Sequence, residues 1–479
     1  MKTTGDEYFD SDEFHDLLAE YEQALSTGQP VFMDADELAE IADYYQMTGQ
    51  ADQADKAINL ALNLSPGAIA PLVYKVHEAI WNGDVALAKT YLSQVIEKDD
   101  PDYVYTTGEV MLAEQLPDEA DRYFSEQLRT VPPDEQQDYV IDVAGIFTDY
   151  GYGEHAMAWM ARAKQEDTPD FKELMARTLF GLGKYKDSER LFNELIDTDP
   201  FSKRYWNALA SAQFMSEKYA DAVQSSEFAI AIDPDDAEGI ISKANGLYRL
   251  GNYEEAQQYY ARYLILEPDD DLALLHRGVC LINLERTEEA LDVLRQALDK
   301  ALAAEEETGQ PSDTLVDIYQ ELAFALSEEG HTDEALAFLD KTDPLDCDHV
   351  QMEIVKGHVL LADERHEEAQ QHFSKALDET DNPRQTLLRI IVSLYDNKYL
   401  EAAYSMFKRY FRLIGDDYDE GYAYMALCCY DMKRYDKFLD YLKEACRRNP
   451  EECRIVLRHL FPDNIEPENY YQYIKDKLQ

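Results

Sequence analysis

The segment His366–His372, which reads HEEAQQH, is the part of the chain that comes closest to a catalytic metal motif. The H-E-x-x-H motif of zinc proteases places two histidines about one helical turn apart, with the glutamate as general base. Here the fourth residue after His366 is Gln370, so no second histidine shares its face. We therefore expect both histidines to be solvated and predict no metal site in this segment.

Two further groups have the residue types of a functional site without its spacing. Gly181–Lys184 reads GLGK and completes neither G-x-x-x-x-G-K-[ST] nor G-x-G-x-x-G. Cys446, Cys453 and His459 are zinc-ligand types, but their separations match no common zinc motif. We therefore predict no catalytic residues, no metal, no cofactor and no small-molecule substrate, and do not expect the chain to be an enzyme.

The elements that would position any site are best read in the stretch from Lys203 to Pro234, which predicts two short amphipathic helices folded back on each other. Apolar residues share one face in each helix because they recur at helical spacing. These residues are Trp206, Leu209, Ala210 and Phe214 in the first helix and Ala222, Val223, Phe228 and Ala229 in the second. Ser216–Tyr219 is the expected turn, and Pro234 ends the second helix because proline cannot donate to the helical ladder.

This stretch resembles the tetratricopeptide repeat (TPR), a helix-turn-helix unit of about 34 residues. The matching residues are Trp206, Leu209-Ala210, Tyr219, Ala222, Ala229 and Pro234. Ser226 departs from the pattern, since a large aromatic residue is usual at that position.

A small residue that opens the second helix recurs along the chain and marks twelve such units. It lets the two helices of a unit approach closely. The series is Ala54, Ala88, Ala120, Ala156, Ser188, Ala222, Ala256, Ala290, Ala335, Ala369, Ala402 and, as a divergent last member, Phe438. Six glycines stand five residues before it, where a first helix can end in the left-handed conformation: Gly49, Gly83, Gly151, Gly183, Gly251 and Gly330.

We therefore predict an all-α fold, a right-handed α-solenoid of about twelve TPR helix-turn-helix repeats with helical caps. Residues 1–33 are expected to form an acidic leader with a capping helix, residues 34–450 the array, and residues 451–479 a capping pair. One step of the series is longer than the rest, and its pattern predicts a second helix that continues to about Glu307. This insertion near 300–312 is either a tolerated extension or a docking element.

The charge of the chain is distributed unevenly. Residues 1–383 hold 28 basic and 82 acidic residues, whereas Arg384–Gln479 holds 16 of each, so the net charge of -54 lies in the first four fifths. Such a surface repels nucleic acid and anionic membranes and attracts basic partners. It also serves simply to keep an open array soluble, and the composition does not choose between these two readings.

The resemblance to TPR proteins implies a binding surface on the concave face, which is lined by the first helix of each repeat. Peptides or helices of partners lie there in that family. The positions carried over are Arg177, Arg204, Asn207, Ser211, Glu238, Asn245, Leu272 and Leu275, preceded by the acidic positions Asp36, Asp43 and Glu109. The carboxylate clamp of some TPR proteins is not expected, because Leu272 and His276 replace its third set of basic residues.

Two functions remain open at this stage. The first is a non-enzymatic protein-protein interaction scaffold or adaptor that binds a peptide or helix of a partner protein. The alternative is an acidic regulatory or chaperone-like subunit that sequesters a basic protein. Neither requires direct contact with nucleic acid or a membrane. No signal peptide or span of about 18 apolar residues is recognised, so we expect a cytoplasmic location and six reduced cysteines.

Overall fold

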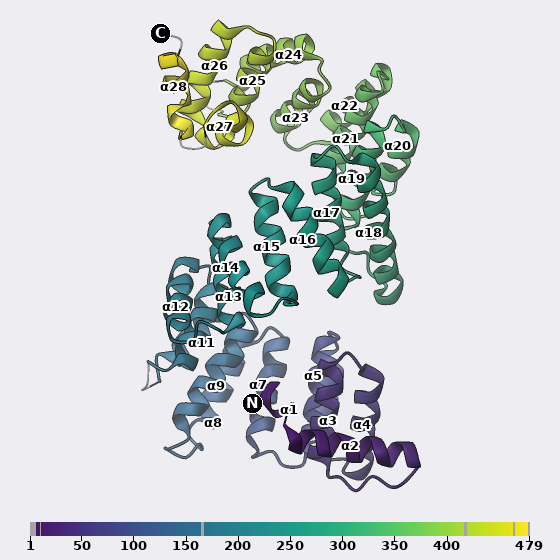
Figure 1. Cartoon of the computed structure of the whole chain (residues 1–479), viewed down its shortest axis with the longest axis vertical. Helices are drawn as coiled ribbons and strands as arrows, with labels where there is room; N and C mark the ends of the chain where they lie inside the picture. The colour runs from purple at the N-terminus through teal and green to yellow at the C-terminus, as the bar shows by residue number, and fades with distance from the viewer. Residues whose placement is uncertain (1–5, 10, 164–166, 416–418, 463–464, 478–479) are drawn as a thin grey trace. The chain divides into compact units, whose positions relative to one another are not determined.

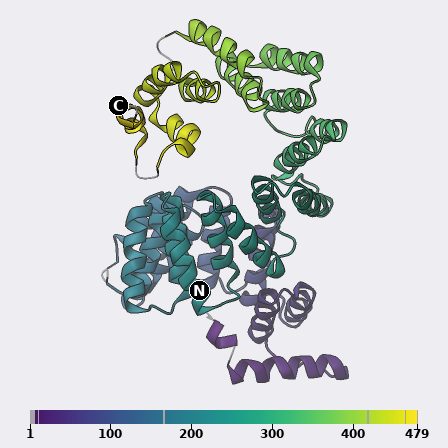
Figure 2. The same ribbon diagram turned by 45° about the horizontal axis from the view of Figure 1, so that its top comes forward.

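The computed structural model describes residues 6–9, 11–163, 167–415, 419–462 and 465–477. Within them the chain folds into helices and turns, and contains no β-strand (Figures 1 and 2). The predicted all-α repeat array is thus confirmed, while its course as one right-handed solenoid stays a prediction. Two compact units, residues 1–234 (unit 1) and residues 235–479 (unit 2), are considered separately. Residues 1–5 and 10 of the predicted leader lie outside the described residues.

Unit 1 is built from short helices. They are α1 (Asp6–Phe9), α2 (Asp12–Thr27), α3 (Ala35–Met47), α4 (Ala51–Leu64), α5 (Ile69–Trp81), α6 (Val85–Leu92), α7 (Pro101–Ala113), α8 (Pro117–Gln127), α9 (Gln136–Asp149), α10 (Gly153–Met160), α11 (Pro169–Gly181), α12 (Tyr185–Thr198), α13 (Lys203–Met215) and α14 (Tyr219–Ile232).

Unit 2 continues the same alternation. Its helices are α15 (Ala237–Arg249), α16 (Tyr253–Leu266), α17 (Asp271–Asn283), α18 (Thr287–Thr308), α19 (Leu315–Glu328), α20 (Thr332–Asp340), α21 (His349–Ala362), α22 (His366–Glu379), α23 (Pro383–Asp396), α24 (Leu400–Ile414), α25 (Tyr422–Asp431), α26 (Tyr435–Arg448), α27 (Pro450–Leu457), η1 (Arg458–Leu460), η2 (Pro467–Asn469) and α28 (Tyr470–Lys477).

Consecutive helices pack as pairs from α3 and α4 to α25 and α26, so the described residues contain the twelve predicted helix pairs. The odd-numbered helix of each pair is the first helix of a repeat and the even-numbered helix is the second. Neighbouring first helices also contact one another, as α3 does α5 and α21 does α23. We call the side of each unit that its first helices form the first-helix face of that unit.

The small residue that opens the second helix is buried in most repeats, as its role in close helix approach requires. The sequence prediction is wrong by one position at Ala402, which is exposed, whereas Ala403 is fully buried. The register was assigned wrongly here because either alanine of the adjacent pair Ala402-Ala403 satisfies the pattern. Phe438 is buried against Tyr430 at a ring-centroid distance of 5.3 Å, so the divergent last repeat fills this contact with an aromatic ring.

The turns between paired helices share a residue in the left-handed conformation. The six glycines predicted there all have positive φ, between 71° and 78°. The other six pairs place a residue with a side chain at the same point, with φ between 57° and 65°: Gln115, Glu217, Glu285, Glu364, Lys398 and Lys433. Lys398 stands five residues before Ala403, so the turn independently supports the corrected register.

The long step of the series is a prolonged second helix, as the pattern predicted. Helix α18 continues to Thr308 and ends at Gly309, which has φ 71°. The following turn is fastened to the start of α17, because the hydroxyls of Ser312 and Thr314 donate to Asp271 Oδ2 at 2.7 and 2.6 Å. The insertion is therefore an ordered part of unit 2.

Helices outside the paired array cover apolar side chains at both ends. Helix α2 buries Phe14 and Tyr21 in the cluster that contains the apolar residues of α3 and α4. At the other end, α27 and α28 bury Cys453 and Tyr470 in the cluster of α25 and α26, and the Phe461 ring stacks on Tyr470 at 3.8 Å. All six cysteines are free thiols.

Candidate functional site

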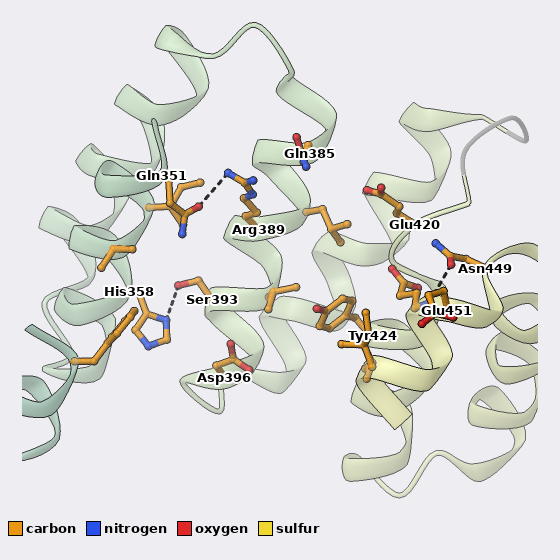
Figure 3. A pocket seen from close by; sticks show the side chains of 18 residues that line it. Gln351, His358, Gln385, Arg389, Ser393, Asp396, Glu420, Tyr424, Asn449 and Glu451 are labelled. Atoms are coloured by element: carbon orange, nitrogen blue, oxygen red, sulfur yellow. Dashed lines mark hydrogen bonds between the residues drawn. The ribbon is translucent and has the colours of Figure 1, made fainter. Parts of the chain in front are cut away.

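Unit 2 contains a hollow of about 550 Å³ on its first-helix face, which we call the C-terminal hollow (Figure 3). Its lining comes from the first helices α19, α21, α23 and α25, the turn before α25, and α27 with its N-cap; no second helix contributes. The residues are Phe324, Gln351, Ile354, Val355, His358, Gln385, Leu388, Arg389, Val392, Ser393, Asp396, Glu420, Tyr424, Asn449, Glu451, Glu452, Ile455 and Val456.

The polar residues of α23 reach the hollow because they recur at helical spacing. Gln385, Arg389, Val392 and Asp396 are separated by four, three and four residues and so lie along one stripe of the helix. The other side of the helix is apolar, and Ile391 is fully buried in the core of unit 2. Helix amphipathicity therefore presents a mixed polar and apolar strip to the hollow.

A hydrogen-bonded pair closes the α21 side of the hollow. The Arg389 guanidinium donates to Gln351 Oε1 at 3.1 Å and to Asp348 Oδ2 at 3.3 Å, which joins α23 to α21 (Figure 3). The cation is therefore already partnered by a carboxylate of the same unit. Because the side chain is partly exposed, the pair is worth little stability but fixes the position of the guanidinium.

His358 forms the floor of the hollow and is held by polar neighbours. Its Nδ1 lies 3.0 Å from Ser393 Oγ and 3.2 Å from Asn397 Nδ2, while the Phe324 ring meets it edge to face at 5.7 Å. Burial lowers the pKa of His358, because desolvation penalises the charged imidazolium. The imidazole is therefore neutral at pH 7 and adds no positive charge.

The opposite wall is organised by Glu452 of α27. Its carboxylate accepts from Gly421 N at 2.6 Å and Ala423 N at 2.9 Å, at the start of α25. No side chain of α25 itself caps that helix, so Glu452 acts as its N-cap from a different helix. Burial raises the pKa of Glu452, although the two N–H groups act to lower it.

The first-helix face of unit 1 has a different character, because its polar groups pair between neighbouring repeats. His77 Nε2 lies 2.7 Å from Glu109 Oε2, and the Tyr105 hydroxyl donates to Asp142 Oδ2 at 2.8 Å. Burial alone would lower the pKa of His77, but the hydrogen bond and charge of Glu109 raise it. Glu109 therefore favours the protonated form of His77.

Two carboxylates of that face have no such partner. Among the described residues Asp36 and Asp43 make no side-chain ion pair, and both lie on α3. Desolvation raises the pKa of Asp36, and the nearby carboxylates of Asp34, Asp100 and Asp102 raise it further. Crowding of like charges therefore marks this part of unit 1 as an electronegative surface.

The site residues predicted in unit 1 are largely engaged within the unit. Arg177 pairs with Asp149, and Arg204 pairs with Glu173. Asn207 is only 2% exposed, so its amide is not available at the surface as the sequence predicted, while Ser211 is half-buried. Arg177 and Arg204 therefore join neighbouring first helices within the unit, whether or not a partner is bound.

The site residues predicted in unit 2 divide in the same way. Asn245 Oδ1 accepts from the Tyr260 hydroxyl at 2.7 Å, and Leu275 is a core residue with 4% of its surface exposed. The prediction that Leu275 forms an exposed apolar groove is wrong, because α17 turns this side chain toward the cluster that contains Leu294. Leu272, at 46%, and Glu238 are exposed.

Sequence reasoning missed the C-terminal hollow, because the candidate positions were carried no further than residue 279. The signal was present: Gln351, His358, Arg389 and Asp396 follow the same polar stripes on first helices. What the sequence could not show is which polar groups would be engaged by their neighbours, and this distinguishes the hollow from the predicted positions.

The motif-like residues behave as parts of the repeats. His372 Nδ1 lies 2.7 Å from Glu353 Oε2, so this histidine is paired with a buried carboxylate and is not simply solvated as predicted. Within the described ranges, no three or more His, Cys, Asp or Glu side chains are arranged to hold a metal ion. No helix in the same ranges is at once long and apolar enough to cross a bilayer.

Comparison with known proteins places the repeat pattern in a family. The tetratricopeptide repeat model matches residues 174–237 and 241–305, which run from α11 to α18. No curated protein matches the chain.

Similar solved structures include a tetratricopeptide repeat protein from Parabacteroides merdae, with 16% identity, a TM-score of 0.40, and coverage of 54% of this chain and 98% of that chain. MamA from Desulfovibrio magneticus is 15% identical, with a TM-score of 0.34 and coverage of 38% and 96%. Another MamA crystal structure is 18% identical, with a TM-score of 0.33 and coverage of 37% and 95%. The tetratricopeptide repeats identified in residues 174–237 and 241–305 thus lie within a longer run of similarly paired helices, from α3 to α26.

Proposed function

We propose that the chain is a non-enzymatic scaffold or adaptor that binds a segment of a partner protein on its first-helix faces. Tetratricopeptide repeats generally mediate protein-protein interactions. The observation that carries the proposal is the C-terminal hollow, which is lined by consecutive first helices and α27 and by no second helix. A partner segment laid across these helices would contact several repeats at once.

The composition of the lining favours a peptide or helix as the occupant. Val392 and Ile455 offer apolar surface, and Ile455 is 74% exposed. Gln385 and Tyr424 add amide and hydroxyl groups, which can bond the backbone of a bound segment. Apolar anchors with a few placed polar groups are the usual composition of a peptide-binding groove.

The positions predicted from the sequence stay part of the proposal in a reduced role. Arg177, Arg204 and Ser211 of unit 1 and Glu238, Asn245 and Leu272 of unit 2 are proposed as flanking contacts on the first-helix face of their own unit. Asn207 and Leu275 are buried, so we propose that they position their helices and do not contact a partner.

A second candidate is an acidic subunit that sequesters a basic protein. It is favoured by the carboxylates Asp36 and Asp43 of α3 in unit 1, which make no side-chain ion pair among the described residues. Attraction by such a surface acts over about 8–10 Å and weakens as salt increases. Binding through unit 1 would therefore be strongly salt-dependent.

Photo-crosslinking from defined positions separates the two candidates. A photoreactive amino acid is placed at Val392 in the hollow, at Asp43 on the unit 1 face, or at the exposed Ser374 on the second helix α22 as control. The proposal predicts protein crosslinks from Val392 in native cell extract, retained at high salt, and none from Ser374. Crosslinks from Asp43 that vanish at high salt, with none from Val392, would favour the acidic subunit.

A further inference from the structure

The polar groups of the C-terminal hollow divide into those already engaged and those left open. Arg389 is bonded to Asp348 and Gln351, and His358 to Ser393. By contrast, within the described residues neither the Asp396 carboxylate nor the Tyr424 hydroxyl makes a hydrogen bond or an ion pair in the unit. Asp396 is exposed and Tyr424 is half-buried, so water reaches both groups and a bound segment can replace that water with its own hydrogen bonds.

These two groups border the same space. Asp396 is the last residue of α23, and Tyr424 lies in the first turn of α25. Figure 3 shows the Tyr424 ring extending toward the side of the hollow that carries Asp396. Burial raises the pKa of Tyr424, and the carboxylates of Glu452 and Asp396 raise it further, which places the hydroxyl within the field of Asp396.

The charge around the open groups is negative. Glu420 and Glu451 line the hollow beside Tyr424, whereas the cation of the lining, Arg389, lies toward α21 and is held there by Asp348. Lys398 also lowers the pKa of Asp396, but burial is the larger influence and raises it. The Asp396 side chain is exposed to solvent, so a cation of a bound segment can reach its carboxylate directly.

Apolar walls stand beside the open carboxylate. Leu388 and Val392 are on the same helix as Asp396, and Ile455 and Val456 face them from α27. A lysine or arginine side chain fits this combination, because its alkyl stem covers apolar surface while its charged end reaches a carboxylate. A phosphorylated or acidic segment does not, because it would meet Asp396, Glu420 and Glu451.

We infer that the C-terminal hollow binds a lysine or arginine side chain of a partner segment, with the cation between the Asp396 carboxylate and the Tyr424 hydroxyl and the stem against Val392, one helical turn from Asp396. This inference rests on the proposed function, since it specifies the segment that the hollow receives. The inference adds a requirement on the partner segment. The segment carries a basic residue, and an apolar residue next to it contacts the exposed Ile455.

Fluorescein-labelled peptides of sequence Ala-Leu-Ala-X-Val-Leu-Ala, acetylated and amidated at their ends, test the inference by anisotropy with the full chain at physiological salt. X is lysine, arginine, norleucine, glutamine or glutamate. The lysine and arginine peptides are expected to bind about tenfold more tightly than norleucine, the gain typical of one charge-assisted hydrogen bond. Asp396→Asn should remove this preference, and Tyr424→Phe should reduce it.

The matched control is Asp378→Asn, which removes the same charge from the exposed face of the second helix α22. It should leave the preference for lysine unchanged, because long-range attraction to an acidic protein is shared by both variants. A preference that survives Asp396→Asn, or that is lost equally in Asp378→Asn, overturns the inference.

A variant of the exposed Ile455 separates this inference from the proposed function. Ile455→Trp narrows the hollow without replacing a buried side chain. If all five peptides bind equally and Ile455→Trp weakens all of them, the hollow receives a segment but does not select a basic residue. If Ile455→Trp changes no binding, or no peptide binds, the proposed site fails together with the inference.

Discussion

The first-helix faces of the two units are built from the same helix pairs but use their polar side chains differently. In unit 1 the faces of neighbouring repeats are joined by pairs such as His77 with Glu109 and Tyr105 with Asp142. In unit 2 the C-terminal hollow leaves Asp396 and Tyr424 unengaged within the described residues. Each unit therefore joins some polar groups between repeats, such as Arg389 with Asp348 in unit 2, but in unit 2 the unengaged groups line a hollow.

This difference separates stability from binding. A side chain that joins two repeats of unit 1 contributes to the nearest-neighbour interface on which a repeat array depends. Among the described residues Asp396 makes no hydrogen bond or ion pair to another repeat of unit 2, so its removal should alter binding and hardly alter melting. The predictions that follow test how far each unit depends on the contacts described for it.

The largest effect on the free energy of unfolding is expected at the residue that opens the second helix of a repeat. This residue is alanine in unit 1 at Ala222 and phenylalanine in unit 2 at Phe438. Phe438→Ala in unit 2 should lower the free energy of unfolding by about 3–5 kcal/mol, because the buried ring leaves a cavity. Ala222→Leu in unit 1 should lower it by about 1–3 kcal/mol, because the added side chain separates two packed helices. Urea denaturation measures both. A parental midpoint for Ala222→Leu would contradict the close approach inferred at this residue.

A smaller effect on stability is expected for Glu452, which lines the hollow and caps α25. Glu452→Ala leaves the N–H groups of Gly421 and Ala423 without their acceptor and should cost about 1–3 kcal/mol. Glu452→Gln should recover part of this loss, because the amide oxygen still accepts. The neighbouring Glu451→Ala is the control, since its side chain is exposed and forms a surface ion pair with Arg454 at 3.4 Å. Equal melting of the two alanine variants would contradict the capping role of Glu452.

The next effect depends on pH and concerns the partly buried Glu321 of unit 2. Burial and the nearby Asp317 raise the pKa of Glu321 to about 7. The folded state therefore holds a proton that the unfolded state releases near pH 4.3, so stability should fall as pH rises from about 4.5 to 7. Glu321→Gln should remove this fall, on the order of 1–2 kcal/mol. Urea midpoints at pH 5, 6, 7 and 8 measure it, and the exposed Glu329→Gln should keep the parental pH profile.

The fold followed from the sequence because its signals are local and repeated. Alanine at the close helix contact and glycine after the first helix each have one physical reason, and that reason recurs in every repeat. The register failed only at Ala402-Ala403, where two adjacent residues both satisfy the rule. Helix α18 could also be foreseen, since its apolar spacing continues to Thr308.

The site followed less well because burial and pairing depend on side chains far apart in the sequence. Leu275 and Asn207 occupy positions that face partners in the family, yet both are buried. Arg204 could not be known to pair with Glu173 of the preceding first helix, nor could Glu452 be known to cap α25. These contacts join different repeats, and hydrophobic periodicity carries no information about them.

The smallest effect concerns the turns, in which the two units again differ. Unit 1 places glycine at four of its six left-handed turn positions, whereas unit 2 places glycine at two and side-chain residues at Glu285, Glu364, Lys398 and Lys433. A residue with a side chain in the left-handed conformation lowers the free energy of unfolding by about 1–2 kcal/mol. Glycine avoids this strain, but its greater freedom in the unfolded chain offsets about 0.5–1 kcal/mol of the gain. Glu364→Gly and Lys398→Gly should therefore each stabilise the chain by about 0.5–1 kcal/mol.

The reverse change in unit 1 is the matched control. Gly151 has φ 78° and no atom within 4 Å of an added Cβ, so Gly151→Ala tests the backbone conformation without a steric clash. It should destabilise the chain by about 0.5–1 kcal/mol, measured as a lower urea midpoint. If Gly151→Ala were neutral and Lys398→Gly destabilising, the side-chain turns of unit 2 would not be strained. The residue at the left-handed turn position would then be determined by its side-chain contacts and not by backbone strain. The turns of the two units would differ only in the side chains that they place at the surface.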